Sequence, residues 1–132
     1  MGQPNTTYRV LLVDDHATVR RGLAALLNAA PDVCVVGEAA DGETALTLVA
    51  DLRPDVVLMD VRMPGMGGVE ATRRIVRDRP GVRVVGMSMD GDAAARRMLA
   101  AGTVVFVPKE ADAGAFLKAI RARRSPTTLT KE

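Results

Sequence analysis

Residues 10–23 read VLLVDDHATVRRGL, in which an apolar run passes directly into two aspartates and then into a segment with helical spacing. The run Val10–Val13 is continuous rather than alternating, which is typical of a strand buried on both faces of a parallel sheet. Downstream, apolar side chains recur with the spacing of one helix face, at Val19, Leu23, Leu26, Leu27 and Ala30. This stretch therefore predicts a buried strand followed by a helix that packs on it.

The same pairing of strand and helix repeats along the chain. Further valine-rich apolar runs follow at nearly even spacing, at residues 33–36, 56–59, 82–87 and 104–107. Segments with helical spacing alternate with them, at residues 45–52, 69–76, 93–101 and 113–120. This alternation predicts an α/β fold with a parallel sheet, right-handed crossovers and helices on both faces. For five strands we expect a doubly wound (βα)5 fold with the flavodoxin-like strand order 2-1-3-4-5.

Composition excludes several classes of protein. The 132 residues are 48% apolar, which suffices for one domain with its own core. The single cysteine, Cys34, rules out a disulfide within the chain, and one cysteine with one histidine cannot form a zinc cluster. No run approaches the roughly 18 apolar residues of a membrane span, and the N-terminal residues lack a signal-peptide core. We therefore expect a soluble, cytoplasmic protein without membrane contact.

The charge balance is slightly basic, with 18 Lys and Arg residues against 16 Asp and Glu residues. Most of the basic residues are scattered arginines, which are more typical of solvated helix faces than of a nucleic-acid-binding stripe. Aromatic residues make up 2% of the chain, so no platform for stacking on bases is expected. Composition thus argues against DNA binding by these residues.

Polar side chains directly follow the buried runs. Asp14 and Asp15 end the first run, Asp60 the third, Ser88 the fourth, and Lys109 comes just after the fifth. With the expected order, strands one and three meet at the switch point, where ligands of open α/β sheets bind. Close carboxylates repel one another unless a cation neutralises them, and oxygen ligands favour Mg²⁺. These groups predict a phosphoryl-accepting acidic pocket with Asp60 as attacking carboxylate, Lys109 as positive charge and Ser88 as hydroxyl donor.

Taken singly, each of these five residues has a simpler interpretation. Adjacent aspartates are often a helix cap and its neighbour, an aspartate before a Pro-Gly pair can be a turn acid, and a lone serine or lysine is more often structural or solvated. For His16, near the start of the first helix, we expect exposure and no further role. Gly65, Gly67 and Gly68 predict a flexible turn rather than a phosphate cradle. Only the joint placement at the strand ends favours a site.

At these residues the sequence resembles a known family. The stretches VLLVDDHATVRRGL (10–23), VVGEAADGETAL (35–46) and RPDVVLMDVRMPGMGGVEATRRI (53–75), with the region from Val84 to Lys109, carry the resemblance. They are similar to the receiver domain of bacterial two-component response regulators, in the NarL/FixJ (LuxR-type) group. The sequence departs from the family pattern at Gly67, where an acid is usual, and at Gly86, which interrupts the fourth strand.

The resemblance implies a CheY-like fold and a role for each site residue. It makes Asp60 the phosphoacceptor and assigns Mg²⁺ or Mn²⁺ to Asp14, Asp15, Asp60 and the backbone carbonyl of Arg62. It makes Lys109 the invariant lysine, Ser88 the switch hydroxyl and Phe106 the rotating aromatic residue. Arg62 and Asp90, each two positions past a pocket residue, are expected to modulate the lifetime of the phosphoryl group.

The resemblance also implies a domain organisation and partners. We expect an N-terminal extension at 1–7, a receiver domain at 8–124 and a linker at 125–132. The last residues, LTKE (129–132), are similar to the opening of the helix-turn-helix DNA-binding domain that follows the receiver in this group. A receiver whose DNA-binding domain is missing is therefore expected, with a natural stand-alone receiver as the alternative. The implied partners are a sensor histidine kinase and, on phosphorylation, a second copy of the chain, with DNA bound only through the missing domain.

The expected function is that of a phosphoacceptor rather than an enzyme, with at most slow autophosphorylation from small donors and slow autodephosphorylation. Phosphorylation would switch the output of a transcriptional regulator. One alternative is a phosphorylation-independent receiver that acts as a protein-interaction module. A phosphatase that forms an aspartyl phosphate is less favoured, because haloacid-dehalogenase-type enzymes place the second acid two residues after the nucleophile. A dinucleotide-binding domain is rejected, because no glycine-rich turn follows the first run.

Overall fold

The continuous apolar runs form one parallel sheet in the computed structural model, which describes residues 7–89 and 92–122. The strand order β2-β1-β3-β4-β5 is the predicted one, and each hydrogen-bonded pair of strands is parallel. Each strand is followed by a helix, so the (βα)5 prediction is confirmed. The elements are β1 (Tyr8–Val13), α1 (Ala17–Asn28), β2 (Val33–Ala39), α2 (Gly42–Leu52), β3 (Val56–Asp60), α3 (Gly67–Asp78), β4 (Arg83–Ser88), α4 (Asp92–Ala101), β5 (Val105–Pro108) and α5 (Ala113–Arg121).

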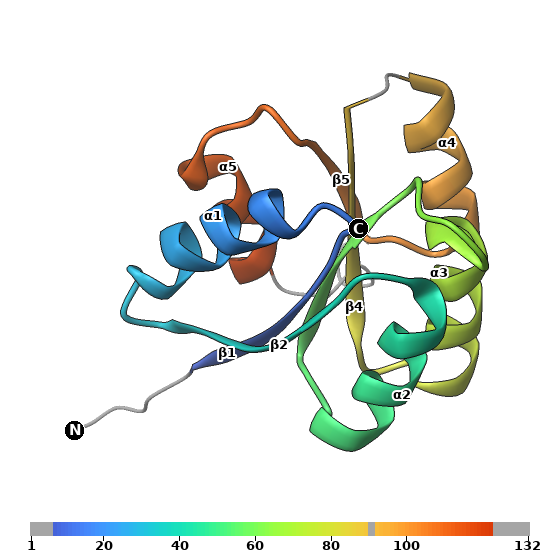
Figure 1. Cartoon of the computed structure of the whole chain (residues 1–132), viewed down its shortest axis with the longest axis horizontal. Helices are drawn as coiled ribbons and strands as arrows, with labels where there is room; N and C mark the ends of the chain where they lie inside the picture. Colours follow the sequence, from blue (N-terminus) through green and yellow to red (C-terminus); the bar gives the residue numbers. More distant parts are fainter. Residues whose placement is uncertain (1–6, 90–91, 123–132) are drawn as a thin grey trace, which may run out of the picture.

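Strand β1 shows why the runs are continuously apolar. Val10 and Leu12 pack into the core beneath α1 and α5, whereas Leu11 and Val13 pack into the core beneath α2, α3 and α4 (Figure 1). All four side chains are 0% exposed, because successive residues of a strand point to opposite faces and both faces are covered. Complete burial of such a side chain contributes about 1.5–3 kcal/mol to the stability of the fold. The centre of the sheet is therefore a stable support for Asp14, the residue that directly follows β1.

Helix α1 buries less of its apolar face than the spacing predicts. Leu23 and Leu27 are buried, but Val19 is 42% exposed and Leu26 is 54% exposed. A helix that lies on a sheet buries a narrow stripe, and Val19 and Leu26 lie on the flank of that stripe. With Phe116 of α5 they line a shallow groove between α1 and α5.

Arg83 corrects the view of the arginines as scattered, solvated charges. It is the first residue of β4, and only 9% of it is exposed. Its guanidinium donates to the backbone carbonyls of Ile120 (2.6 Å), Ala119 (3.4 Å) and Ala122. The last carbonyls of a helix have no partner within the helix and carry partial negative charge, so a buried cation there stabilises the end of α5.

Several predictions concern residues outside the described ranges. Asp90 and the linker at 125–132 lie there, so the role of Asp90 and the domain boundaries remain predictions. Cys34 is described and lies exposed near the start of β2. Among the helices that the structure describes, none is both long and apolar enough to cross a membrane.

Candidate functional site

The polar residues that end the strands lie together at one edge of the sheet, as predicted. Asp14 directly follows β1, Asp60 ends β3, Ser88 ends β4 and Lys109 directly follows β5. Backbone hydrogen bonds extend the sheet to these positions: the Asp14 N–H donates to the Ala39 carbonyl (3.0 Å), and the Lys109 N–H donates to the Ser88 carbonyl (3.0 Å). The positions of the side chains are therefore set by the sheet and not by loops.

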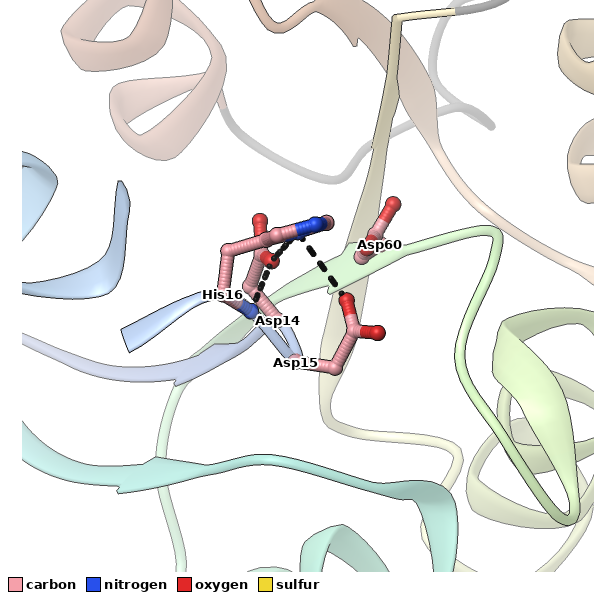
Figure 2. Close-up of side chains that lie close together, drawn as sticks. All are labelled: Asp14, Asp15, His16 and Asp60. Atoms are coloured by element: carbon pink, nitrogen blue, oxygen red, sulfur yellow. Dashed lines mark hydrogen bonds and ion pairs between the residues drawn. The ribbon is translucent and has the colours of Figure 1, made fainter. Parts of the chain in front are cut away.

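The acidic side chains form a cluster at this edge. One ligand atom each of Asp14, Asp15, His16 and Asp60 lies within 4.8 Å of the other three (Figure 2). Asp14 is 0% exposed and Asp60 is 3% exposed, while Asp15 and His16 are exposed. Carboxylates this close repel one another, and their oxygens are the ligands that hard divalent cations prefer. The donor set therefore fits Mg²⁺ or Mn²⁺.

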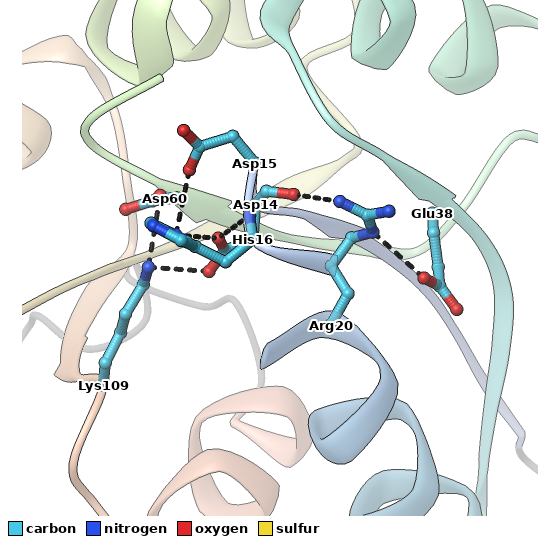
Figure 3. Close-up of polar contacts among 7 residues, drawn as sticks. All are labelled: Asp14, Asp15, His16, Arg20, Glu38, Asp60 and Lys109. Carbon is cyan, nitrogen blue, oxygen red and sulfur yellow. Dashed lines mark hydrogen bonds and ion pairs between the residues drawn. The ribbon is translucent and has the colours of Figure 1, made fainter. Parts of the chain in front are cut away.

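Lys109 connects the two buried carboxylates. Its Nζ atom lies 2.7 Å from Asp14 Oδ2 and 3.2 Å from Asp60 Oδ2 (Figure 3). Burial disfavours the charge on this lysine, but its hydrogen bond to Asp14 and the charges of Asp60 and Asp14 outweigh burial and hold the pKa of Lys109 above its ordinary value. Lys109 is therefore a fixed positive charge beside the Asp60 carboxylate.

Opposing effects act on the pKa of the Asp60 carboxyl group. Its pKa is raised, chiefly by burial and further by the charge of Asp14, while Lys109 and the backbone N–H of Arg62 act in the lowering direction. The anionic form of Asp60 is thus less favourable than that of an ordinary aspartate, and a bound cation would favour it. Arg62 contacts Asp60 through its N–H, and the role of its carbonyl as a metal ligand stays a prediction.

His16 has contacts that the sequence interpretation missed. Its side chain is 66% exposed, which confirms the predicted exposure, but its Nδ1 atom lies 3.2 Å from Asp14 Oδ1 and 3.1 Å from Asp15 Oδ1. The backbone N–H of His16 also donates to Asp14 Oδ1 at 2.9 Å. These contacts go beyond simple exposure, whereas the expectation that His16 has no further role stays a prediction. Its position directly after the two aspartates was the available signal.

Arg20 is a second residue that the sequence interpretation missed. From the first turns of α1, its Nη1 atom donates to the backbone carbonyl of Asp14 at 2.5 Å, and its Nε atom donates to Glu38 Oε1 at 3.0 Å (Figure 3). Only 17% of the Arg20 side chain is exposed. Arg20 thus fixes the end of β1 relative to β2, and it is not the solvated arginine that was predicted.

Gly68 gives the turn after β3 a tighter geometry than the predicted flexible turn. A Cβ atom on Gly68 would lie 1.9 Å from the carbonyl oxygen of Asp60, and the Gly68 N–H donates to the Val61 carbonyl at 3.0 Å. Only glycine permits this approach of α3 to the backbone of Asp60. Gly67 also has a positive φ of 76°, which favours glycine where the family usually has an acid.

Ser88 and Phe106 lie on the neighbouring strands β4 and β5, and the expected movement of their side chains stays a prediction. Ser88 is buried at the end of β4, and Phe106 of β5 pairs in register with Gly86 of β4. A Cβ atom on Gly86 would lie 3.0 Å from Phe106 Cδ1 and 3.2 Å from Met98 Cε. Gly86 therefore provides space for the ring of Phe106. It does so within a strand that runs unbroken from Arg83 to Ser88, so the expectation that Gly86 interrupts the fourth strand is wrong.

Comparison with known proteins agrees with this arrangement. The family model of the response regulator receiver domain matches residues 10–121. The chain belongs to this family. An acidic cluster like that of Asp14, Asp15 and Asp60 is typical of the magnesium site of a receiver.

The receiver is similar to parts of longer regulators. It is 44% identical over 114 residues to the response regulator GacA of Pseudomonas viridiflava, covering 86% of this chain and 53% of GacA. It is also 44% identical over 115 residues to the transcriptional regulatory protein LiaR of Bacillus subtilis, covering 86% of this chain and 54% of LiaR. Its fold matches a LuxR-family two-component response regulator from Aurantimonas sp. with a TM-score of 0.82 and 39% identity, covering 87% and 83% of the two chains. This receiver thus spans about half the length of these curated relatives.

Proposed function

We propose that the receiver accepts a phosphoryl group on Asp60 from the phosphohistidine of a sensor histidine kinase. The observation that carries this proposal is the Lys109 ammonium, which lies 3.2 Å from Asp60 Oδ2 and 2.7 Å from Asp14 Oδ2 in a buried pocket. A buried carboxylate beside a fixed cation and a cluster of metal-binding acids has the parts that phosphoryl transfer needs. Membership of the receiver family supports a kinase as the general class of partner.

The proposed reaction is a substitution at phosphorus. An oxygen of Asp60 attacks the phosphorus atom, the new O–P bond forms, and the P–N bond breaks with its electron pair passing to the imidazole of the kinase. When bound at Asp14, Asp15, Asp60 and the Arg62 carbonyl, Mg²⁺ or Mn²⁺ would supply neutralisation of the phosphoryl charge. Lys109 supplies a further positive charge to a phosphoryl oxygen, and the Ser88 hydroxyl donates a hydrogen bond to another.

The proposed switch follows from the new charge. Phosphorylation converts the singly charged Asp60 carboxylate into an acyl phosphate that carries about two negative charges and strong acceptor oxygens, which draw Lys109 and Ser88 toward it. Phe106 then turns into the space that Ser88 leaves, helped by the missing Cβ at Gly86. The face made by α4, β5 and α5 would have two conformations, and phosphorylation would change the ratio of their populations. A hundredfold change in that ratio requires about 2.7 kcal/mol of differential stabilisation.

The proposed output is transcriptional. The receiver unit at residues 8–124 would control a DNA-binding domain outside it, and two phosphorylated copies would pair. The similarity to LiaR, a transcriptional regulatory protein of which the matched region covers 54%, supports this proposal. Light scattering with and without beryllofluoride and Mg²⁺ tests the pairing, and a mass that stays monomeric in both samples contradicts it.

A phosphorylation experiment tests the central proposal. The chain is incubated with Mg²⁺ and either acetyl phosphate or phosphoramidate, which carries the same kind of P–N bond as phosphohistidine, and intact mass is measured. Wild type is expected to gain one phosphoryl group, and Asp60→Asn is expected to gain none. Asp78→Asn is the matched control, because Asp78 lies exposed on α3 and pairs only with its neighbour Arg77 among the ion pairs that the structure gives it.

Two outcomes would count against the proposal. If the wild-type chain gains no mass from either donor, the proposal that it is a phosphoacceptor is refuted. If the Asp60→Asn variant still gains the mass of a phosphoryl group, the acceptor is another residue. If NMR spectra also show no shift at α4 and β5 on addition of beryllofluoride, the phosphorylation-independent interaction module becomes the better description.

A further inference from the structure

We propose that His16 is an additional ligand of the divalent cation and makes the pocket favour first-row transition-metal ions such as Ni²⁺ over Mg²⁺. This inference rests on the cation site of the proposed function and concerns which ion that site selects. The structure places the ring of His16 against the acidic cluster, with contacts from Nδ1 to both neighbouring aspartates (Figure 2).

The contact distances fit a shared coordination sphere. Two ligand atoms at right angles on an ion with bonds of about 2.1 Å lie about 3.0 Å apart. His16 Nδ1 lies 3.2 Å from Asp14 Oδ1 and 3.1 Å from Asp15 Oδ1, which is close to that separation. Each of the two carboxylate oxygens can therefore occupy a position next to Nδ1 around one octahedral ion with small adjustments.

The two oxygens of Asp14 face different partners. Oδ2 faces the Lys109 ammonium at 2.7 Å, whereas Oδ1 faces His16. A cation therefore finds the Lys109 side of Asp14 already occupied by a positive charge. The open side of the pocket is the one that Oδ1, Asp15 and His16 share, which places an incoming ion within reach of the imidazole.

The backbone of His16 is fixed by hydrogen bonds at the start of α1. His16 occupies the N-cap position of α1, yet its side chain makes no capping hydrogen bond within the described part of the helix. The usual use of a polar side chain at this position is thus absent here. Instead, the backbone N–H of His16 bonds to Asp14 Oδ1 at 2.9 Å, and its carbonyl accepts from the Arg20 N–H at 3.0 Å. These bonds fix the backbone from which the side chain reaches the carboxylates.

The chemistry of imidazole makes this contact selective. Mg²⁺ favours oxygen ligands and keeps water at its other positions, whereas imidazole nitrogen suits Fe²⁺, Ni²⁺, Cu²⁺ and Zn²⁺. Mn²⁺ also favours oxygen ligands and lies at the low-affinity end of the first transition row, in which affinity in general rises up to Cu²⁺. Without an ion, Nδ1 shares a hydrogen bond with the acceptor Asp14 Oδ1 at 3.2 Å. Binding of the ion replaces this hydrogen bond and requires the neutral ring with its proton on Nε2, which leaves the Nδ1 lone pair for the ion. His16 should therefore strengthen the binding of transition-metal ions and contribute little to the binding of Mg²⁺.

Pulsed electron paramagnetic resonance on the Mn²⁺-loaded chain tests the inference directly. The sequence contains 1 histidine, so any modulation from an imidazole nitrogen must come from His16. The modulation is expected in wild type and in the control Arg21→Gln, an exposed change on α1, and it should be lost in His16→Gln. Because the signal is read on the wild-type chain, the test does not depend on how well a variant folds.

Calorimetry gives a second, independent readout. His16→Gln is expected to weaken Ni²⁺ binding about tenfold or more and Mn²⁺ binding by a smaller factor, while Mg²⁺ binding changes less than about twofold. Absence of nitrogen modulation in wild type overturns the inference, as does an equal loss of affinity for all three ions. A wild-type chain that binds Mg²⁺ normally but shows no nitrogen signal leaves the proposed function standing. If the chain binds no divalent cation at all, both the proposed function and the inference about His16 are refuted.

Discussion

Replacing Lys109 with methionine should destabilise the receiver by about 3 kcal/mol in metal-free buffer near neutral pH. The change leaves the carboxylates of Asp14 and Asp60 without their shared ammonium, and their side chains are only 1% and 4% exposed. Removal of one partner from a buried ion pair costs about 3–5 kcal/mol, because the remaining charge stays desolvated. The lower end applies here, because the Asp15 side of the pocket, where that side chain is 29% exposed, is open to water.

Urea unfolding followed by circular dichroism measures this loss. The pKa of Asp60 is already raised, and removal of Lys109 raises it further, so the charged carboxylate penalises the folded state at a pH above the folded pKa. As pH falls through that pKa, the carboxyl group takes up a proton and the deficit should shrink. Mg²⁺ should also reduce it, since a ligand at a hundred times its Kd contributes about 2.7 kcal/mol.

A double variant separates charge from packing. Lys109→Met with Asp60→Asn should recover most of the lost stability, whereas Lys118→Met, a matched change at an exposed lysine on α5, should cost less than about 0.5 kcal/mol. If the deficit is the same at acidic pH, with Mg²⁺ and in the double variant, the lost packing of the lysine stem explains the effect. The electrostatic reasoning about the pocket would then be refuted.

Further predictions concern the turn after β3, the space beside β5, the end of α5 and the attacking carboxylate. Gly68→Ala should cost about 3 kcal/mol in urea unfolding and slow phosphorylation, because the new Cβ would lie 1.9 Å from the Asp60 carbonyl oxygen. Gly86→Ala should cost about 1 kcal/mol and shift the ring signals of Phe106, which are readily assigned by NMR because the chain has 2 phenylalanines. Arg83→Met should lower the thermal midpoint by removing about 2 kcal/mol, since the last carbonyls of α5 lose their donor. The rate of phosphorylation by acetyl phosphate should decline at a higher pH than an ordinary aspartate would give, because the raised pKa of Asp60 removes the reactive carboxylate earlier as pH falls.

Matched controls accompany these substitutions. Gly81→Ala introduces a methyl group where the described atoms leave open space, so it should have little effect on phosphorylation. Arg77→Met removes an exposed arginine of α3 that pairs with the adjacent Asp78. Equal losses in a test variant and its control, or a pH profile of an ordinary aspartate, would contradict the corresponding prediction.

The sequence was sufficient to predict the strand order and the residues at the strand ends. Residues such as Val10 and Leu11 are both buried although they face opposite ways, so the apolar runs identify strands that are covered on two sides. Once those strands are parallel, topology alone brings Asp14, Asp60 and Lys109 to one edge. No side-chain detail is needed for that step.

Contacts that depend on side-chain direction could not be predicted. Arg20 and Arg83 look like other arginines in a linear sequence, and their acceptors are backbone carbonyls that any residue could provide. The periodicity of α1 placed Val19 and Leu26 on the apolar face, but the width of the stripe that the sheet covers is a property of the packed helix. The turn of the His16 ring toward the carboxylates likewise depends on the local backbone at the start of α1.

The position of Cys34 gives this molecule a convenient attachment point for a spectroscopic label. The thiol is exposed near the start of β2, while Ala39 at the other end of that strand accepts the backbone hydrogen bond of Asp14. Five residues of parallel strand, at about 3.3 Å each, separate the thiol from the pocket edge by roughly 16 Å. A maleimide dye there is close enough for distance-dependent quenching by a paramagnetic ion in the pocket and too far to touch the acids. Because the sequence contains 1 cysteine, the native chain can be labelled at a single position without any substitution.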